Sequence, residues 1–216
     1  MKFELMEMAG IQSALKGMRY PTKSKGDSKI IDGNFIMGES DKKLAKHLLN
    51  KKEKIVVHNP ETDEYIFGGD VHGKFQRAII AWFDIDAPRY IWSELDTYMV
   101  GMSPVSSEST MYTLIKECGD ITYDMFAEHT PKKMIDAFIE TVDDLEEEYG
   151  DRKHIPIHIL KAALPEGWMQ GRVRAYSYQT LRRIHHYRKT HRLPEWQIIC
   201  DAIENLPFAD ELIFGK

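Results

Sequence analysis

The sequence predicts an α+β protein that is rich in helix, with a small antiparallel or mixed sheet formed mainly by the N-terminal half. Most of the segments with strand character lie in the first 85 residues, whereas apolar residues at helical spacing recur along the rest of the chain. The 216 residues are 43% hydrophobic and 29% charged, which is a globular composition with enough length for a sizeable core. Because no repeat or long linker interrupts the chain, we expect residues 1–216 to form a single domain.

Strand character is concentrated in three places. Residues 2–10 alternate between polar and apolar side chains, which is typical of a half-buried strand. Residues 54–69 read as a short strand and a turn, with Asn59-Pro60 as the break. The apolar run 78–85 indicates a buried strand or the end of a helix. Between the first two, residues 21–38 are polar and contain glycine, so we expect a long mobile surface loop there.

Helices are predicted where apolar residues recur every three or four positions or where a capping residue precedes such a run. Ser40 and Asp41 are expected to cap one of these helices. Pro131 suits the first turn of another, whose polar face carries a run of acidic residues that we expect to be solvated. The approximate predicted bounds are 11–18, 40–50, 87–100, 131–149, 155–164, 178–190 and 194–206.

Charge, cysteine content and hydropathy exclude several classes of protein. No apolar run approaches the roughly 18–20 residues that cross a bilayer. The first residues lack the basic and apolar parts of a secretory signal. Two distant cysteines, Cys118 and Cys200, indicate neither a disulfide framework nor a zinc site. We therefore expect a cytoplasmic protein that does not contact membranes. The net charge of −5 disfavours a general nucleic-acid coat.

The segment 172–192 stands out because it holds seven Arg and Lys residues, three His residues and no Asp or Glu. A segregated positive field of this kind attracts phosphates, and arginine grips them with two hydrogen bonds. Arg188 shares a helical face with Leu181 and Ile184, so its guanidinium is expected to point inward and to need a partner. That partner is either a bound anion or a carboxylate such as Glu195 or Asp201. Arg174 belongs to the same basic stretch and is a further candidate ligand-binding residue.

The sequence gives no evidence for a metal site or for the common catalytic and nucleotide-binding motifs. His154 and His158 are four residues apart, but Pro156 lies between them and no third ligand is near, so we expect no metal. The sequence contains no G-x-S-x-G, no Walker A motif and no G-x-G-x-x-G.

Three stretches carry a resemblance to a known family. They are Leu164–Trp168 with Ser177–Leu181 and Tyr187-Arg188, then His191–Trp196, and finally His72–Phe75 with Ala87–Glu94. Together they resemble the flavin-dependent thymidylate synthases, the ThyX family, from His72 onward. The resemblance implies the ThyX-like fold, a homotetramer, FAD as cofactor and a nucleotide as ligand.

Individual site residues follow from the same resemblance. The family has an Asn-x-Arg-x-Leu helix, and its last turn carries an Arg that binds the substrate nucleotide. Aligned without gaps, the Asn falls on Ser177, the first Arg on Gln179 and the nucleotide-binding Arg on Arg188.

In the family signature, Arg-His-Arg followed by a Ser, the arginines help to hold flavin and substrate, and this triplet differs in this chain. Depending on register, the triplet falls on Asp96-Thr97-Tyr98 or on Thr97-Tyr98-Met99, and neither contains an arginine. Tyr98 is therefore the candidate ligand-binding residue at this position. The family Ser falls in the serine-rich run 106–111, so Ser107 or Ser109, with the backbone N–H groups of residues 101–109, would cradle a phosphate. A plain polar loop is the alternative interpretation of that run.

Residues just before the signature are further candidates. Arg89, Tyr90 and Trp92 could stack on a base. Alternatively, Trp92 belongs to the core and Arg89 pairs with Glu94 or Asp86.

Three functions follow from these observations. The first is a nucleotide-binding protein of ThyX-like fold with a degenerate flavin and substrate signature. Some segments of the sequence, such as Ser93–Tyr98, also resemble a divergent ThyX-like group from bacteriophages. A phage protein of this kind would act in nucleotide metabolism or sequester a signalling nucleotide in the host cytoplasm. The second is an active thymidylate synthase-like transferase that methylates or hydroxymethylates dUMP or a related nucleotide. The third, which the acidic net charge disfavours, is a nucleic-acid binder that uses the basic helix.

Overall fold

The computed structural model describes residues 1–51, 57–59, 64–66, 72–117 and 121–216. The chain divides into two compact units. The first unit comprises Met1–Glu4, Asp84–Met99 and Pro104–Arg174, and the second comprises Leu5–Phe83, Val100–Ser103 and Ala175–Lys216.

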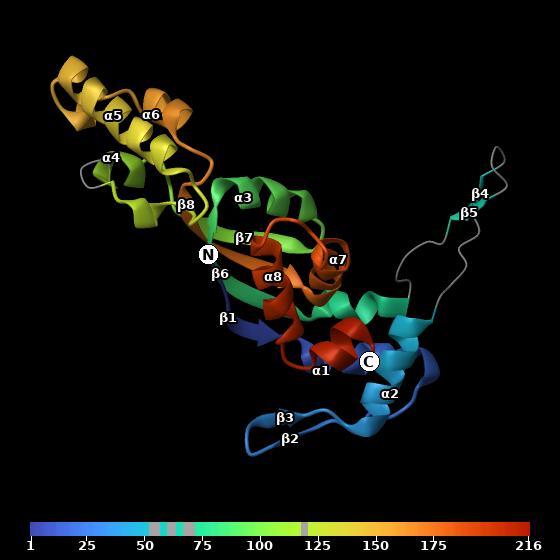
Figure 1. Ribbon diagram of the computed structural model, residues 1–216. Helices are drawn as coiled ribbons and strands as arrows, with labels where there is room; N and C mark the ends of the chain where they lie inside the picture. Colours follow the sequence, from blue (N-terminus) through green and yellow to red (C-terminus); the bar gives the residue numbers. More distant parts are fainter. Residues whose placement is uncertain (52–56, 60–63, 67–71, 118–120) are drawn as a thin grey trace. The chain divides into compact units, whose positions relative to one another are not determined.

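The architecture is α+β with a small antiparallel sheet, as the sequence predicts (Figure 1). Four strands form this sheet in the order β1-β6-β8-β7. Their bounds are β1 Lys2–Ala9, β6 Ile80–Pro88, β8 Met169–Ser177 and β7 Met102–Ser107. Along β6 every second side chain is buried, which is the period-2 pattern of a strand. The run 78–85, for which the sequence left a helix end open, is thus part of a strand.

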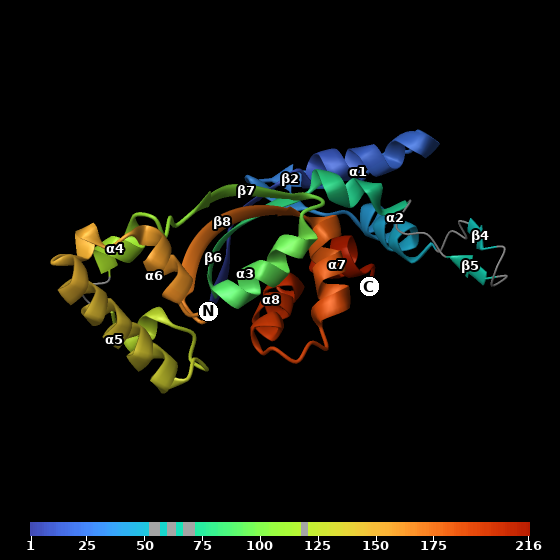
Figure 2. The same cartoon turned by 90° about the horizontal axis from the view of Figure 1, so that it is seen from above.

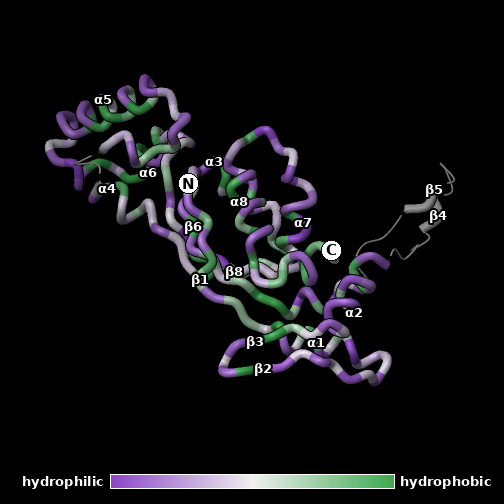
Figure 3. Tube along the Cα trace, turned by 60° about the horizontal axis from the view of Figure 1, so that its bottom comes forward, coloured by the Kyte–Doolittle hydropathy of each residue, from purple (hydrophilic) through white to green (hydrophobic). Residues whose placement is uncertain are grey.

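The first unit contains a cluster of helices, of which α5 has 18 residues, and an apolar core. Its elements are α3 Arg89–Leu95, η3 Asp96–Tyr98, α4 Thr113–Glu117, η4 Tyr123–Met125, α5 Lys132–Tyr149, η5 Arg152–His154 and α6 Ile157–Ala163. Apolar side chains of α5 face this core, so green and purple alternate along the helix in Figure 3. At its centre Phe126, Phe138 and Trp168 meet edge to face, with ring centroids 5.2–6.3 Å apart.

The second unit holds the remaining elements. They are α1 Ile11–Arg19, η1 Tyr20–Thr22, β2 Lys29–Ile31, β3 Asn34–Ile36, α2 Glu39–Asn50, β4 Val57–Asn59, β5 Glu64–Ile66, η2 His72–Ala78, α7 Tyr178–Arg188, α8 Glu195–Glu204 and the π-helical turn η6 Asp210–Phe214. Helices α7 and α8 lie side by side (Figure 2). The Tyr178 hydroxyl donates to Pro207 O at 2.8 Å, and burial raises the pKa of Tyr178. The expected strand and turn in residues 54–69 correspond to the antiparallel pair β4–β5, and the rest of that range lies outside the described residues.

The segment 21–38 differs from the expected loop, because residues 29–36 form the antiparallel hairpin β2–β3. Asp32 and Gly33 both have positive φ, 51° and 80°. An Asp-Gly pair in this conformation is the preferred two-residue hairpin turn. The turn signal was present in the sequence, but the polar composition around it obscured it.

The expected cap of α2 is also wrong. The structure places Gly38 at the N-cap, and Asp41 is buried instead of capping. The carboxylate of Asp27 accepts the backbone N–H groups of Ser40 at 2.9 Å and Asp41 at 3.0 Å. A side chain from outside the helix therefore satisfies its first turn.

No helix in the described part of the chain is both long and apolar enough to cross a bilayer. Across the same residues, no three His, Cys, Asp or Glu side chains gather in a way that could hold a metal ion.

Candidate functional site

A cavity of about 470 Å³ lies in the second unit, beside the junction of β8 and α7. Its polar lining residues come from three separate segments of the chain: Arg77 from η2, Gly101 and Ser103 from the segment before and within β7, and Ser177 and Gln179 from the junction. The cavity thus brings the Ser177–Gln179 pair together with residues 101–103, the start of the 101–109 segment. Ser107 and Ser109, the side chains that the sequence nominated in that segment, are not among its described lining residues. Its volume lies within the range of small-molecule sites.

Hydrogen bonds fix the wall of this cavity. The Ser177 hydroxyl caps α7 by accepting the N–H of Thr180 at 3.2 Å. The backbone N–H of Ser177 donates to Gly101 O at 2.8 Å, and the Thr180 hydroxyl donates to Val100 O at 2.6 Å. The start of α7 is therefore tied to the 100–101 segment, and Ser177 has a structural task besides any contact with a ligand.

Gly101 is required at this wall for two reasons. Its φ is +78°, a conformation that other residues adopt only with strain. A Cβ there would also lie 2.7 Å from Ser177 Oγ and closer still to Thr180 Oγ1. We expect Gly101→Ala to destabilise the protein by about 1–3 kcal/mol and to open the junction. Thermal unfolding measures this, with Gly17→Ala in α1 as the control, because nothing lies within 4 Å of a Cβ at Gly17. Equal melting temperatures for Gly101→Ala and wild type would show that the wall is not rigid.

Arg77 supplies the positive charge of the cavity. Its Nε donates to Gln179 Oε1 at 2.8 Å, which orients the guanidinium. Its terminal nitrogens make no hydrogen bond to any of the described residues. An exposed guanidinium with two free N–H directions is suited to an oxyanion such as a phosphate. Sequence reasoning missed Arg77, although it lies two residues beyond the His72–Phe75 stretch that resembles the family.

A second cationic cluster lies in the first unit. The guanidinium carbons of Arg172 and Arg174 lie 4.4 and 4.8 Å from the ring centroid of Trp92. Asp96 pairs with both, at 3.6 Å from Arg172 Nη1 and 2.5 Å from Arg174 Nη2. Trp92 is buried and donates to Gln170 O at 3.0 Å, which supports the core interpretation of this residue.

Arg174 is the most buried arginine of this cluster, since only 6% of its side chain is exposed. Its Nε and Nη1 are buried and have no hydrogen-bond partner among the described residues. Buried donors without a partner are costly, so an anion that reached them would bind with a large gain. The basic stretch 172–192 covers two elements of the structure. Arg172 and Arg174 lie on β8, and Arg188 lies on α7.

Arg188 is half-buried, and its guanidinium lies over the Trp196 ring at 4.6 Å from the centroid. It is not among the residues that line the described cavity beside Gln179. Trp196 therefore accounts for one face of the guanidinium, and the role of Arg188 in binding a nucleotide stays a prediction.

The remaining candidates belong to the first unit. Arg89 contacts Glu166 at 3.3 Å and donates to Leu164 O at 3.4 Å, so it is held by a partner that the sequence did not suggest. Tyr98 is buried. Ser107 is exposed at the end of β7, and the carbonyl of Ser109 accepts the N–H groups of the following turn.

Comparison with solved structures places this geometry in a known fold. The crystal structure of thymidylate synthase X from Helicobacter pylori with FAD and dUMP matches with a TM-score of 0.70 at 18% identity, covering 99% of this chain and 97% of that one. The chain has a ThyX-like fold. A second structure of ThyX from the same organism, complexed with FAD and dUMP, gives a TM-score of 0.68 at 17% identity, covering 99% and 98%. No family model and no curated protein sequence matches the chain.

The segment at the ThyX signature position offers little to a flavin. The Thr97 hydroxyl donates to Glu94 O at 2.7 Å, Tyr98 is buried and Met99 is exposed. None of these side chains supplies the guanidinium that the resemblance assigns to flavin and substrate binding. Two arginines outside the triplet, Arg172 and Arg174, pair with Asp96, and Arg174 is buried over the Trp92 ring. These residues do not fit the role, and we derive no flavin-dependent step.

Proposed function

We propose that this protein binds a nucleotide in the cavity lined by Arg77, Ser103, Ser177 and Gln179, and that it does so without flavin-dependent catalysis. The ligand is a nucleoside phosphate, with dUMP as the first candidate because the similar structures contain it. In this assignment Arg77 holds the phosphate and the Gln179 amide contacts the base or sugar. A protein of this kind acts in nucleotide metabolism or sequesters a signalling nucleotide.

One observation carries the proposal. The Ser177–Gln179 junction, which the ThyX resemblance nominated, lines one cavity together with residues 101–103 and with the Arg77 guanidinium, whose terminal nitrogens make no hydrogen bond to the described residues. Among the described lining residues no carboxylate accompanies Arg77, so its charge is available to a phosphate. The charge and size of the cavity suit a nucleoside monophosphate.

Replacing Arg77 by alanine tests the assignment. We expect dUMP to bind the wild type saturably and to bind Arg77→Ala about 10- to 100-fold more weakly, because one charge-assisted phosphate grip is lost. Isothermal titration calorimetry measures the affinities. The matched control is Arg183→Ala, since Arg183 is exposed on α7 and does not line the cavity. Equal losses in the two variants, or none in Arg77→Ala, would refute the assignment.

Two alternatives give different results with the same preparation. Flavin absorbance in the purified protein would support the active thymidylate synthase-like enzyme. Binding to DNA that weakens steeply with salt would support a nucleic-acid binder. Stabilisation by dUMP, another mononucleotide or a cyclic dinucleotide without flavin supports the proposal.

The proposal also covers the domain organisation, the assembly and the cellular location of the protein. We take residues 1–216 as one ThyX-like domain, related to the bacteriophage-type group, that assembles as a homotetramer in the cytoplasm. Arg188, Arg174, Arg89, Tyr98, Ser107 and Ser109 stay candidate ligand-binding residues within it. Mass determination in solution tests the tetramer directly.

A further inference from the structure

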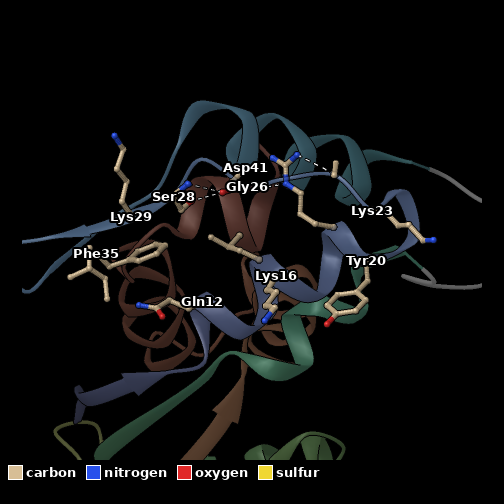
Figure 4. Close-up of a pocket in the computed structure, with 13 residues that line it drawn as sticks. Gln12, Lys16, Tyr20, Lys23, Gly26, Ser28, Lys29, Phe35 and Asp41 are labelled. Carbon is tan, nitrogen blue, oxygen red and sulfur yellow. Dashed lines mark hydrogen bonds and ion pairs between the residues drawn. The ribbon is translucent and has the colours of Figure 1, made fainter.

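A larger cavity, of about 710 Å³, lies elsewhere in the second unit (Figure 4). It shares no lining residue with the cavity beside Gln179. Its walls come from α1, the turn that follows α1, the hairpin β2–β3 and the start of α2. Phe35 and Lys29 lie toward one end, and Tyr20 and Lys23 toward the other, with Lys16 between them (Figure 4).

A buried ion pair holds these walls in place. Arg19 Nε donates to Asp41 Oδ1 at 2.7 Å, and both side chains are at least nine-tenths buried. The other oxygen of Asp41 accepts the hydroxyl of Ser28 at 2.6 Å and the backbone N–H groups of Asp27 and Ser28. The 24–28 segment is thereby tied to α1 and α2. At the far wall Phe35 packs edge-on against Phe208, with ring centroids 5.7 Å apart.

The charge of this cavity is unbalanced. Asp41 is the one carboxylate among its lining residues, and Arg19 neutralises it. The ammonium groups of Lys16, Lys23 and Lys29 form no ion pair with the described residues. Three free cations thus surround a floor that contains Leu15, an exposed Ile30 and the Phe35 ring.

We propose that this cavity is a second nucleotide site, one that takes a nucleoside polyphosphate. The base packs against Phe35 and Ile30, and the phosphate chain runs along the cavity, with Lys29 near its start, Lys16 at its middle and Lys23 at its far end (Figure 4). A fatty acid would also find an apolar floor, but its single carboxylate leaves two of the three ammonium groups unmatched. A polyphosphate matches all of them, and an aromatic base gains from the ring.

Calorimetric titration with ATP tests the site. The titration uses the full chain carrying Arg77→Ala, so that the cavity beside Gln179 contributes only weak binding. We expect saturable ATP binding that weakens about 30-fold when Lys16→Gln and Lys29→Gln are added, because two charge-assisted contacts are lost. Adenosine and inorganic phosphate, used separately, should each bind at least about tenfold more weakly than ATP, since each fills only part of the cavity.

The control variant makes the same change of charge, two Lys→Gln substitutions, outside the cavity. Lys43→Gln with Lys46→Gln alters two exposed lysines of α2 that do not line the cavity, and this variant should bind ATP as well as its parent. Equal weakening in both double variants would reduce the effect to general charge and overturn the site. Unchanged binding in the Lys16/Lys29 variant, or lysine-dependent binding of oleate in preference to ATP, would also overturn it.

The two nucleotide proposals fail separately. In a chain with Arg77 intact, Lys16→Gln with Lys29→Gln should leave dUMP binding unchanged. Loss of dUMP binding there would place dUMP in the larger cavity and contradict the first assignment. All of these lysines are exposed, so the melting temperature should stay within about 2 °C of the wild type in each variant.

Discussion

Asp41→Asn is expected to destabilise the protein by about 3–5 kcal/mol, because it leaves the buried Arg19 guanidinium without its counter-charge. For a chain of this length such a loss lowers Tm by roughly 10 °C. The amide also places N–H groups where the Asp41 carboxylate now accepts hydrogen bonds from Ser28 and Asp27. Thermal unfolding measures the effect. Asp32→Asn makes the same chemical change at the exposed hairpin turn, where Asn-Gly is as favourable as Asp-Gly, and should leave Tm unchanged.

The stabilisation that the Asp41 carboxylate provides should depend on pH. Burial alone would raise the pKa of Asp41, but the hydrogen bonds from Ser28 and Arg19 and the positive charge of Arg19 outweigh it and hold the pKa below its ordinary value. A carboxyl whose pKa is lower in the folded protein stabilises the fold above its unfolded pKa, and that contribution is lost as the pH falls through the folded pKa. The Tm difference between wild type and Asp41→Asn should therefore shrink as the pH drops below about 4. A difference that is constant with pH would assign the effect to shape and not to charge.

Arg174→Met is expected to change stability by less than about 1 kcal/mol while removing an anion-binding group. Two buried donors of Arg174 have no partner among the described residues, which costs free energy in the folded protein, whereas its ion pair with Asp96 and its stacking on Trp92 stabilise the fold, so the two contributions largely offset each other. Asp96 keeps its contact with Arg172 and is half exposed, so it tolerates the change. Thermal unfolding with and without dUMP or pyrophosphate measures both effects.

Arg172→Met serves as the comparison variant for Arg174→Met. Arg172 donates to Gln170 Oε1 at 2.8 Å and lies over Trp92, so Arg172→Met should lower Tm. If Arg174→Met lowers Tm as much as Arg172→Met and leaves anion-induced stabilisation intact, Arg174 is a structural ion-pair residue and not a ligand group.

Amphipathic spacing predicted most helices because their burial follows from local sequence. The predicted helix over 131–149 appears as α5, and Gly150 ends it in the left-handed conformation. Strand β8 was not predicted, because Arg172 and Arg174 were interpreted as part of a basic stretch that binds phosphate. In the structure their charge is matched by Asp96, which lies more than 70 residues away in the sequence, and by the face of Trp92.

In the candidate site, too, the sequence predicted some residues but not those whose role depends on contacts between distant segments. Ser177 and Gln179 could be nominated because a resemblance covers them. Arg77 could not, since its contact with Gln179 spans 102 residues and depends on the tertiary fold. The cap of α2 was misassigned for a related reason. Asp41 has the local position of a capping residue, but burial beside Arg19 gives it a stronger partner than the first turn of its own helix.

A crystal structure of the protein grown with dUMP tests the central claim most directly. The account predicts a nucleotide in the cavity of the second unit, with phosphate oxygens about 2.7–3.2 Å from the terminal nitrogens of Arg77. A nucleotide bound with its phosphate away from Arg77, or only solvent in that cavity at saturating dUMP, would contradict it.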